Sequence, residues 1–402
     1  MDPNQVICNI SSFQHLCESN KICSELIVLF LKNKANINQF FKKKNSPLHL
    51  ICNNVESKAN IIQILIENKA EINSKNYLNQ TPLFSLVSNE SVDLEMTELL
   101  LENKSDINHQ DNHGKTALHY LFNNVNAPFN EIIESFTKHK ADTNIRDSYY
   151  QRSFFHLICK ENKTRFSILL PILLQSGADP NLKNKNGRTP FYMLCKNGFF
   201  EDIYETFITD FSADSNIKDK NSMTPFHHFC KNEKNNEKHL QFFLINKADP
   251  NIKEDYLNNT PFHYFLLRNV YNTTLINHFF QNKADPNILN INRSSVFHLL
   301  FKNNKISNKE VLLFLEHSNP NISDFYNRTP FYFYCEKDII TNEIVSNFFQ
   351  KNCDPNLLAI NHSTPFLEFS KNRKSTYPTL RNFFRNKADP NFVKKKKSFF
   401  LL

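Results

Sequence analysis

Residues 224–251, TPFHHFCKNEKNNEKHLQFFLINKADPN, decide the fold of this chain, because both ends of the stretch recur along the sequence. The opening tetrad, Thr-Pro-Phe-His, returns at 260–263 and, as Ser-Pro-Leu-His, at 46–49. The closing phrase, Ala-Asp-Pro-Asn, returns at 284–287 and, as Ala-Glu-Ile-Asn, at 70–73. Eleven such units follow one another with a period of 34 to 37 residues, the first with a degenerate tetrad at 11–14. Self-similarity at this period predicts a repeat architecture.

Each unit predicts two helices followed by a hairpin loop. The Thr or Ser of the tetrad is a helix N-cap residue, and Pro fits the first helical position, where no N–H is needed. The first helix is short, as at 225–231. The second helix has apolar residues at helical spacing, such as Leu240, Phe243 and Leu244. We expect the Pro of the closing phrase to stop this helix and the next seven or so residues to form the loop.

The tetrad, the closing phrase and the 11 or 12 residues from each phrase to the next tetrad resemble the ankyrin repeat family. An acidic residue five positions before the tetrad also matches, at Asp111, Asp219, Asp255 and Asp324. The resemblance implies an all-α solenoid of stacked helix-turn-helix units with hairpin loops over about residues 11–393. Residues 1–10 would then be an N-terminal cap segment, and 394–402 a basic and apolar tail or a truncated repeat.

The chain departs from the family pattern in several places. Its repeat is about two residues longer, and the hairpin glycine is kept at Gly114 and Gly187, with Asn commonly elsewhere. The usual pair of alanines in the first helix is replaced by a bulky residue and often Cys, as at 194–195 and 229–230. We expect these bulky residues to widen or tilt the stacking. Pro171, inside an expected second helix, predicts a kink or a late helix start.

Composition excludes several fold classes. The 402 residues include only 4 Gly and no Trp, so the glycines that a Rossmann fold, a P-loop or a β-propeller requires are missing. The net charge of +8 is weaker than the dense basic footprint of a dedicated nucleic-acid binder. The N-terminus does not resemble a secretory signal, and the longest apolar runs are too short to span a bilayer. We therefore expect an intracellular, soluble protein in the cytoplasm or nucleus, with its nine cysteines as thiols.

Histidine recurs at the fourth position of the tetrad. One interpretation is a row of general bases or metal ligands. The other, which the family resemblance implies, is a structural imidazole that binds the neighbouring loop and joins successive repeats. No carboxylate or nucleophile recurs beside these histidines, which favours the structural role. The histidines are His49, His119, His156, His227, His263 and His298.

Cysteine recurs three residues after the tetrad. The His-x-x-Cys spacing could place two zinc ligands on one helical face, but a structural zinc site needs four ligands. Helices of adjacent repeats pack ~8–10 Å apart, too far to share an ion, so we expect small buried side chains. No catalytic triad, carboxylate pair or phosphate-binding loop stands out, and we expect no enzyme activity, cofactor or metal. The cysteines are Cys17, Cys52, Cys159, Cys195, Cys230 and Cys335.

A partner-binding surface is predicted at the hairpin tips, where the family resemblance places partner contacts. Exposed Tyr, Phe and Arg dominate interface energetics. Alternatively, each aromatic ring folds onto its own hairpin, and the sequence leaves both interpretations open. The tip residues are Tyr77, Leu78, Tyr149, Tyr150, Arg152, Tyr256, Leu257, Phe325, Tyr326 and Arg328.

The sequence therefore predicts a non-catalytic scaffold or adaptor that binds a protein partner along the concave surface of hairpins and inner helices, and no small-molecule substrate. A second hypothesis is a substrate-recognition or regulatory subunit of an enzyme system, such as a ubiquitin ligase or a signalling complex. A third is electrostatic binding of nucleic acid or membrane through the lysine runs at 42–44 and 394–397, the latter followed by Phe-Phe-Leu-Leu. A solvated hairpin and a capping fragment are the alternatives for these two runs.

Overall fold

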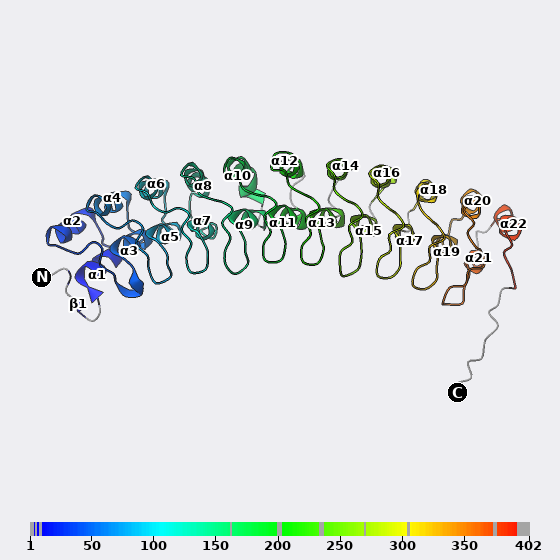
Figure 1. The fold of residues 1–402 in the computed structure, drawn as a ribbon, viewed down its shortest axis with the longest axis horizontal. Coiled ribbons are helices and arrows are strands. Elements are labelled where there is room, and N and C mark those ends of the chain that lie inside the picture. Colours follow the sequence, from blue (N-terminus) through cyan, green and yellow to red (C-terminus); the bar gives the residue numbers. More distant parts are fainter. Residues whose placement is uncertain are drawn as a thin grey trace, which may run out of the picture. The chain divides into compact units, whose positions relative to one another are not determined.

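The computed structural model describes residues 4, 6–7, 10–160, 163–198, 203–232, 237–268, 271–303, 306–372 and 376–391. Within this part of the chain the helices come in pairs, and each pair is followed by a hairpin loop (Figure 1). The chain divides into two compact units, which are taken separately below. Unit 1 comprises residues 1–200 and 209–213, and unit 2 comprises residues 201–208 and 214–402.

In unit 1 the first helices of the pairs contact one another in series, as do the second helices, and the hairpin loops extend beyond the first helices (Figure 1). Two short antiparallel strands, β1 (Val6–Ile7) and β2 (Ile10–Ser11), precede the first pair. The first helices are α1 (Ser12–Glu18), α3 (Pro47–Asn53), α5 (Pro82–Val87), α7 (Ala117–Leu121), α9 (Phe154–Lys160) and α11 (Pro190–Asn197). The second helices are α2 (Ser24–Lys32), α4 (Ala59–Glu67), α6 (Leu94–Glu102), α8 (Phe129–Lys138) and α10 (Lys163–Gln175).

Unit 2 repeats the same arrangement. Its first helices are α13 (Pro225–Lys231), α15 (Pro261–Leu267), α17 (Val296–Leu300), α19 (Pro330–Cys335) and α21 (Pro365–Ser370). Its second helices are α14 (Glu237–Ile245), α16 (Thr273–Gln281), α18 (Asn308–His317), α20 (Asn342–Gln350) and α22 (Tyr377–Arg385). Helix α12 (Ile203–Thr209) belongs to unit 2 except for its last residue.

The tetrads start the first helices as predicted. Thr224 is the N-cap of α13, its side chain accepts from the N–H of His227, and Pro225 holds the first helical position. The predicted helix at 225–231 matches α13. The prediction of an all-α repeat fold is confirmed.

The second helices end earlier than the proline of the closing phrase, so the predicted role of that proline is wrong. α14 ends at Ile245, and Lys247 takes a left-handed conformation with φ of 65°. The N–H of Ala248 then donates to the carbonyl of Phe243, and the N–H of Lys247 to that of Leu244. This pair of bonds is a Schellman motif, which closes the helix before Pro250 is reached.

The core of unit 2 is a continuous stack of phenylalanine rings. Phe262, from a tetrad, lies 4.2 Å from Phe279 of its own repeat and 6.0 Å from Phe314 of the next, between ring centroids. Phe297 in turn lies 5.2 Å from Phe314 and 6.0 Å from Phe348. All five rings are buried. Each tetrad ring therefore joins its own repeat to the one that follows, and burial of such rings supplies most of the packing energy.

Two further sequence expectations concern the start of the helix that contains Pro171 and the presence of membrane-spanning helices. α10 begins at Lys163 and runs through Pro171 to Gln175, so the predicted late start is wrong. Pro171 is exposed, and its ring therefore does not have to fit into the core. In the described part of the chain, no helix combines the length and the apolar character needed to cross a bilayer.

Candidate partner-binding surface

Successive hairpin tips are joined by main-chain hydrogen bonds. In unit 1 the N–H groups of Tyr77, Asn112, Ser148 and Lys185 donate to the carbonyls of Lys43, Leu78, His113 and Tyr150, at 2.8–3.0 Å. In unit 2 the N–H groups of Asp255, Ile291, Phe325 and Ile360 donate to the carbonyls of Asn221, Leu257, Asn292 and Tyr326, also at 2.8–3.0 Å. Along the tips of each unit, these bonds form a ladder of main-chain hydrogen bonds in which no side chain takes part.

In several hairpins a buried carboxylate accepts hydrogen bonds from backbone N–H groups of the same hairpin. Asp111 accepts from the N–H groups of His113 and Lys115, both at 2.9 Å. At residues 254–259 the same role belongs to Glu254, which accepts from three N–H groups. The match of Asp255 to this position is wrong by one residue, because this hairpin has one residue more than the hairpin at 111–115; Asp255 is exposed.

The tetrad histidines connect neighbouring repeats. In His263 the ring Nδ1 accepts from the N–H of Thr260, the N-cap of its own helix, at 3.3 Å. Its Nε2 lies 3.2 Å from the carbonyl of Ser294 in the next hairpin. The other five histidines bind in the same way, to the carbonyls of Gln80, Arg152, Arg188, Asn259 and Arg328. All six rings are buried, and within the described residues no group of three or more His, Cys, Asp or Glu could hold a metal ion.

The six recurring cysteines lie in the core. Each is a thiol with at most 2% of its surface exposed. Burial raises the pKa of Cys17, Cys52, Cys159, Cys230 and Cys335 well above the usual range of a thiol. A neutral buried thiol is a poor nucleophile and a poor metal ligand, so these side chains act in packing.

The predicted tip residues divide evenly between the two units, five in each. Tyr77 and Tyr256 are 71% and 80% exposed. Tyr149 and Tyr150 pack edge to face, with ring centroids 4.4 Å apart, and the guanidinium of Arg152 lies 4.3 Å from the Tyr150 ring centroid. Neighbouring rings thus support one another without being buried.

The unit 2 tips show the same arrangement around Arg328. Phe325 and Tyr326 are exposed and pack edge to face at 5.6 Å. Arg328 lies over the Tyr326 ring and forms two hydrogen bonds with Asp324, at 3.0 and 2.8 Å. Leu78 is exposed, whereas Leu257, Arg152 and Arg328 are half-buried.

Two further exposed tip residues escaped the sequence prediction. Ile291 and Ile360 are 55% and 58% exposed and occupy the tip position of Phe325 in the flanking hairpins of unit 2. The predicted set includes the leucines Leu78 and Leu257, so residue type alone does not account for the omission. Both isoleucines stand four residues before a tetrad, the position that Tyr77 also occupies.

A groove of about 640 Å³ lies beside the hairpin at 147–152 in unit 1. Hairpin residues Tyr149, Tyr150 and Arg152 line it. Phe122, which follows α7, and Leu157 of α9 line it as well. The groove therefore combines hairpin-tip residues with residues of the inner helices.

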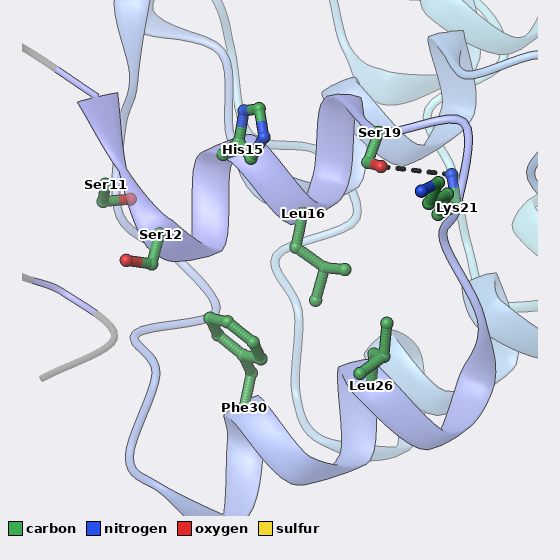
Figure 2. A pocket seen from close by; sticks show the side chains of 8 residues that line it. All are labelled: Ser11, Ser12, His15, Leu16, Ser19, Lys21, Leu26 and Phe30. Atoms are coloured by element: carbon green, nitrogen blue, oxygen red, sulfur yellow. Dashed lines mark hydrogen bonds between the residues drawn. The ribbon is translucent and has the colours of Figure 1, made fainter. Parts of the chain in front are cut away.

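A second hollow, of about 500 Å³, lies in the first repeat of unit 1 (Figure 2). Leu16, Leu26 and Phe30 face one another across it, whereas the imidazole of His15 points away from Phe30. The dashed bond joins the Ser19 hydroxyl to the N–H of Lys21. The serine and histidine side chains that line it do not converge.

A set of asparagine side chains that bind the preceding repeat was also not predicted from the sequence. Asn89 donates from Nδ2 to the carbonyls of Cys52 and Asn54 in the preceding repeat, at 3.0 and 3.1 Å. Asn124 makes the equivalent bonds to Val87 and Asn89. The signal is recurrence of Asn eight residues after the first residue of the tetrad, at 54, 89, 124, 197, 232, 303 and 372.

The lysine run at 42–44 forms a short 3-10 turn (η1, Lys42–Lys44) at a hairpin tip, with all three side chains exposed. The run at 394–397 and the apolar residues 399–402 lie outside the described residues.

Comparison with known proteins agrees with this architecture. A family model described as ankyrin repeats (3 copies) matches residues 13–111, 48–147 and 155–254, which together make up more than half of the chain. A Rickettsia felis protein named as an ankyrin repeat protein is 37% identical over 54 residues. That match covers 13% of this chain and 24% of the relative's length.

Proposed function

The chain belongs to the ankyrin repeat family, whose repeats generally mediate protein–protein interaction, and from this premise we propose that it is a non-catalytic scaffold or adaptor. A partner protein binds along the hairpin tips and the exposed sides of the first helices. The observation that carries the proposal is the set of exposed aromatic tip residues held on a main-chain ladder.

Rigidity makes these tips suitable for binding. The ladder bonds, the internal hairpin carboxylates and the histidine bonds fix the tip backbone before any partner arrives. A preorganised surface loses little conformational entropy on association. Aromatic side chains have few torsions and large contact areas, so an exposed Tyr held in place is a good candidate hot spot.

The second candidate is a recognition or regulatory subunit of an enzyme system, such as a ubiquitin ligase or a signalling complex. Its tips would bind in the same way, and the identity of the captured partner decides between the two. We also propose that residues 11–393 form the repeat domain, that 1–10 act as its cap, and that the protein works in the cytoplasm or nucleus.

The test is affinity capture with a tip variant in which Tyr77, Tyr149, Tyr256 and Tyr326 are changed to Ser. A hot-spot residue contributes roughly 2 kcal/mol or more, so loss of four should abolish capture. The matched control changes exposed apolar residues away from the tips, Leu29, Val125, Ile245 and Tyr377, to Ser. Circular dichroism checks that both variants stay helical.

A partner captured by the wild type and the control, but lost by the tip variant, supports the proposal. Equal capture by all three proteins would overturn the tip site.

A further inference from the structure

The basic charge of the protein is concentrated on the hairpins of unit 1. Its five loops, at 39–45, 74–80, 109–115, 145–152 and 182–188, contain ten Lys or Arg and two Asp. The corresponding loops of unit 2, at 217–223, 252–259, 288–294, 322–328 and 357–363, contain five Lys or Arg and four Asp or Glu. The excess of eight positive charges in the unit 1 loops equals the net charge of the whole chain.

The two acidic residues of the unit 1 loops are not exposed to solvent. Asp111 and Asp147 are both about 95% buried. Asp111 accepts from hairpin N–H groups and from the hydroxyl of Tyr120, and Asp147 accepts from the N–H of Tyr150 at 2.6 Å. Their carboxylates are directed into the hairpins, so the exposed surface of these loops is cationic.

The groove beside the hairpin at 147–152 combines this charge with apolar side chains. Lys115, Arg152 and Lys160 line it together with Phe122 and Leu157. None of the three cations forms an ion pair with a carboxylate of the described residues.

The charged groups of the groove are held in place. The carbonyl of Arg152 accepts from the Nε2 of His119, which fixes its backbone, and the guanidinium lies over Tyr150. The ammonium of Lys115 lies 5.4 Å from the Tyr120 ring centroid. Cations fixed on aromatic rings, with no carboxylate partner, are ready to receive one.

We propose that this groove docks an acidic segment of a partner protein. Partner carboxylates pair with Lys115, Arg152 and Lys160, and an apolar side chain of the segment lies on Phe122 and Leu157. The proposal rests on the scaffold function proposed above and names the partner chemistry of unit 1. The unit 2 tips carry mainly apolar residues, so the selection of acidic partners belongs to unit 1.

The groove favours a peptide over nucleic acid. Phe122 and Leu157 line it together with the three cations, and these apolar residues suit an apolar side chain flanked by carboxylates. Nucleic-acid surfaces instead use many cations that follow a regular phosphate backbone. Here the two loops that supply the groove's tip residues hold only three Lys or Arg between them.

The experiment measures binding of three fluorescent probes to the full chain by anisotropy. The acidic probe is a dodecapeptide of Glu and Asp around a central Phe-Leu pair, and the amide probe replaces each acid by Gln or Asn. The third probe is a single-stranded oligonucleotide of the same net charge. We expect the acidic probe to bind about tenfold more tightly than the amide probe and more tightly than the oligonucleotide.

Two variants with the same change in charge locate the site. Lys115→Gln, Arg152→Gln and Lys160→Gln together should weaken binding of the acidic probe about tenfold. Lys218→Gln, Lys220→Gln and Arg293→Gln, on exposed loops of unit 2, should change it less than about twofold.

Equal binding of the acidic and amide probes, equal weakening by both triple variants, or tighter binding of the oligonucleotide would each overturn the proposal. These outcomes leave the scaffold function standing as long as the tyrosine tip variant loses its captured partner. Retention of that partner would instead remove the scaffold function itself.

Discussion

Each tetrad histidine has its proton placed by its neighbours. The backbone N–H of the N-cap residue points at Nδ1, which must therefore accept, and Nε2 faces a carbonyl, which can only accept. The ring is neutral with its proton on Nε2. A second proton on Nδ1 would face an N–H donor in a buried site, so burial lowers the pKa of His156, His227, His263 and His298 to about 4.

This arrangement predicts loss of stability in mild acid. Below pH 6.5 the unfolded histidines bind protons that the folded ones cannot, so the free energy of unfolding falls as the pH drops towards 4. Each of the four histidines should account for roughly 3 kcal/mol of that loss at pH 4, and stability should be level above about pH 7. Urea midpoints followed by circular dichroism between pH 7.5 and 4.5 measure the effect.

His263→Phe is the control for this prediction. Phe84 occupies the equivalent position in another repeat and is buried, so the ring fits. The variant should be about 2 kcal/mol less stable at pH 7, because Thr260 and Ser294 lose their partners, but its midpoint should fall less steeply in acid. An unchanged pH slope would show that the histidines do not cause it.

At the scale of elements, the second helices close with a left-handed residue that is usually lysine. Lys69, Lys104 and Lys140 have φ of 62–67°, and only the second helix α10 ends with glycine, Gly177, at 69°. A side chain in this conformation costs roughly 1–2 kcal/mol. The helices therefore stop at a fixed place at the expense of some stability.

Alanine substitutions at two glycines distinguish the cost of the left-handed conformation from the cost of a steric clash. A Cβ at Gly177 would meet no atom within 4 Å, so Gly177→Ala should cost about 1 kcal/mol. A Cβ at Gly114 would lie 2.7 Å from the backbone nitrogen of Ser148, which donates in the ladder. Gly114→Ala should therefore cost about 2 kcal/mol more, measured as a shift in thermal or urea midpoint.

Lys104→Gly is the converse change and should stabilise unit 1 by up to about 1 kcal/mol. Equal losses from the two alanine variants would contradict the contact at Gly114, and no gain from Lys104→Gly would contradict the conformational cost.

The helix starts could be predicted from the sequence and the helix ends could not. N-capping depends on a Thr or Ser and the next three residues, which are all in the tetrad. The end of a helix depends on whether one residue adopts a positive φ. A glycine in the sequence would have indicated this conformation, whereas Lys69 and Ser212 do not. Five of the tip turns likewise have a residue other than glycine or asparagine in the left-handed region, although glycine or commonly asparagine was expected there; these residues are Lys44, Gln151, Ser222, Arg293 and His362.

At the scale of the whole molecule, three kinds of side-chain bond recur between successive repeats. The histidines bind the next hairpin, and Asn89 binds the end of the preceding first helix. The asparagine of each closing phrase binds the next phrase; Asn73 donates to the carbonyl of Lys104 and accepts from the N–H of Asp106. Stability in such an array is a sum of repeat terms and nearest-neighbour terms.

Asn89→Ala tests the neighbour term. It removes the side-chain donor from the buried carbonyl of Cys52 and from that of Asn54, which keeps the N–H of Ser57, and should cost roughly 1–3 kcal/mol, mostly at one interface between repeats. Hydrogen exchange should show protection lost first in α1 to α4, while α6 to α8 remain protected. Asn186→Ala, on an exposed hairpin, is the control and should change little. Uniform loss of protection along unit 1 would contradict nearest-neighbour coupling.

The candidate site was only partly accessible from the sequence. Tyr77, Tyr149 and Tyr256 stood out as aromatic residues in polar loops, and the structure places them at exposed tips. The groove beside Arg152 depends on α7 and α9 lying next to the hairpin, which no local pattern encodes. Asn89 was hidden because asparagine is so common in this chain that its periodic use did not stand out.

In each hairpin loop the main chain joins neighbouring repeats, whereas the side chains determine what the surface recognises. Since the N–H of Tyr77 meets the carbonyl of Lys43 whatever side chains those residues carry, a codon change at a tip alters what the surface recognises and leaves the repeat register intact. Recognition can then drift while the scaffold is inherited unchanged, and paralogues can diverge one loop at a time. The same positions are the ones to randomise in a library that selects new binders on this backbone.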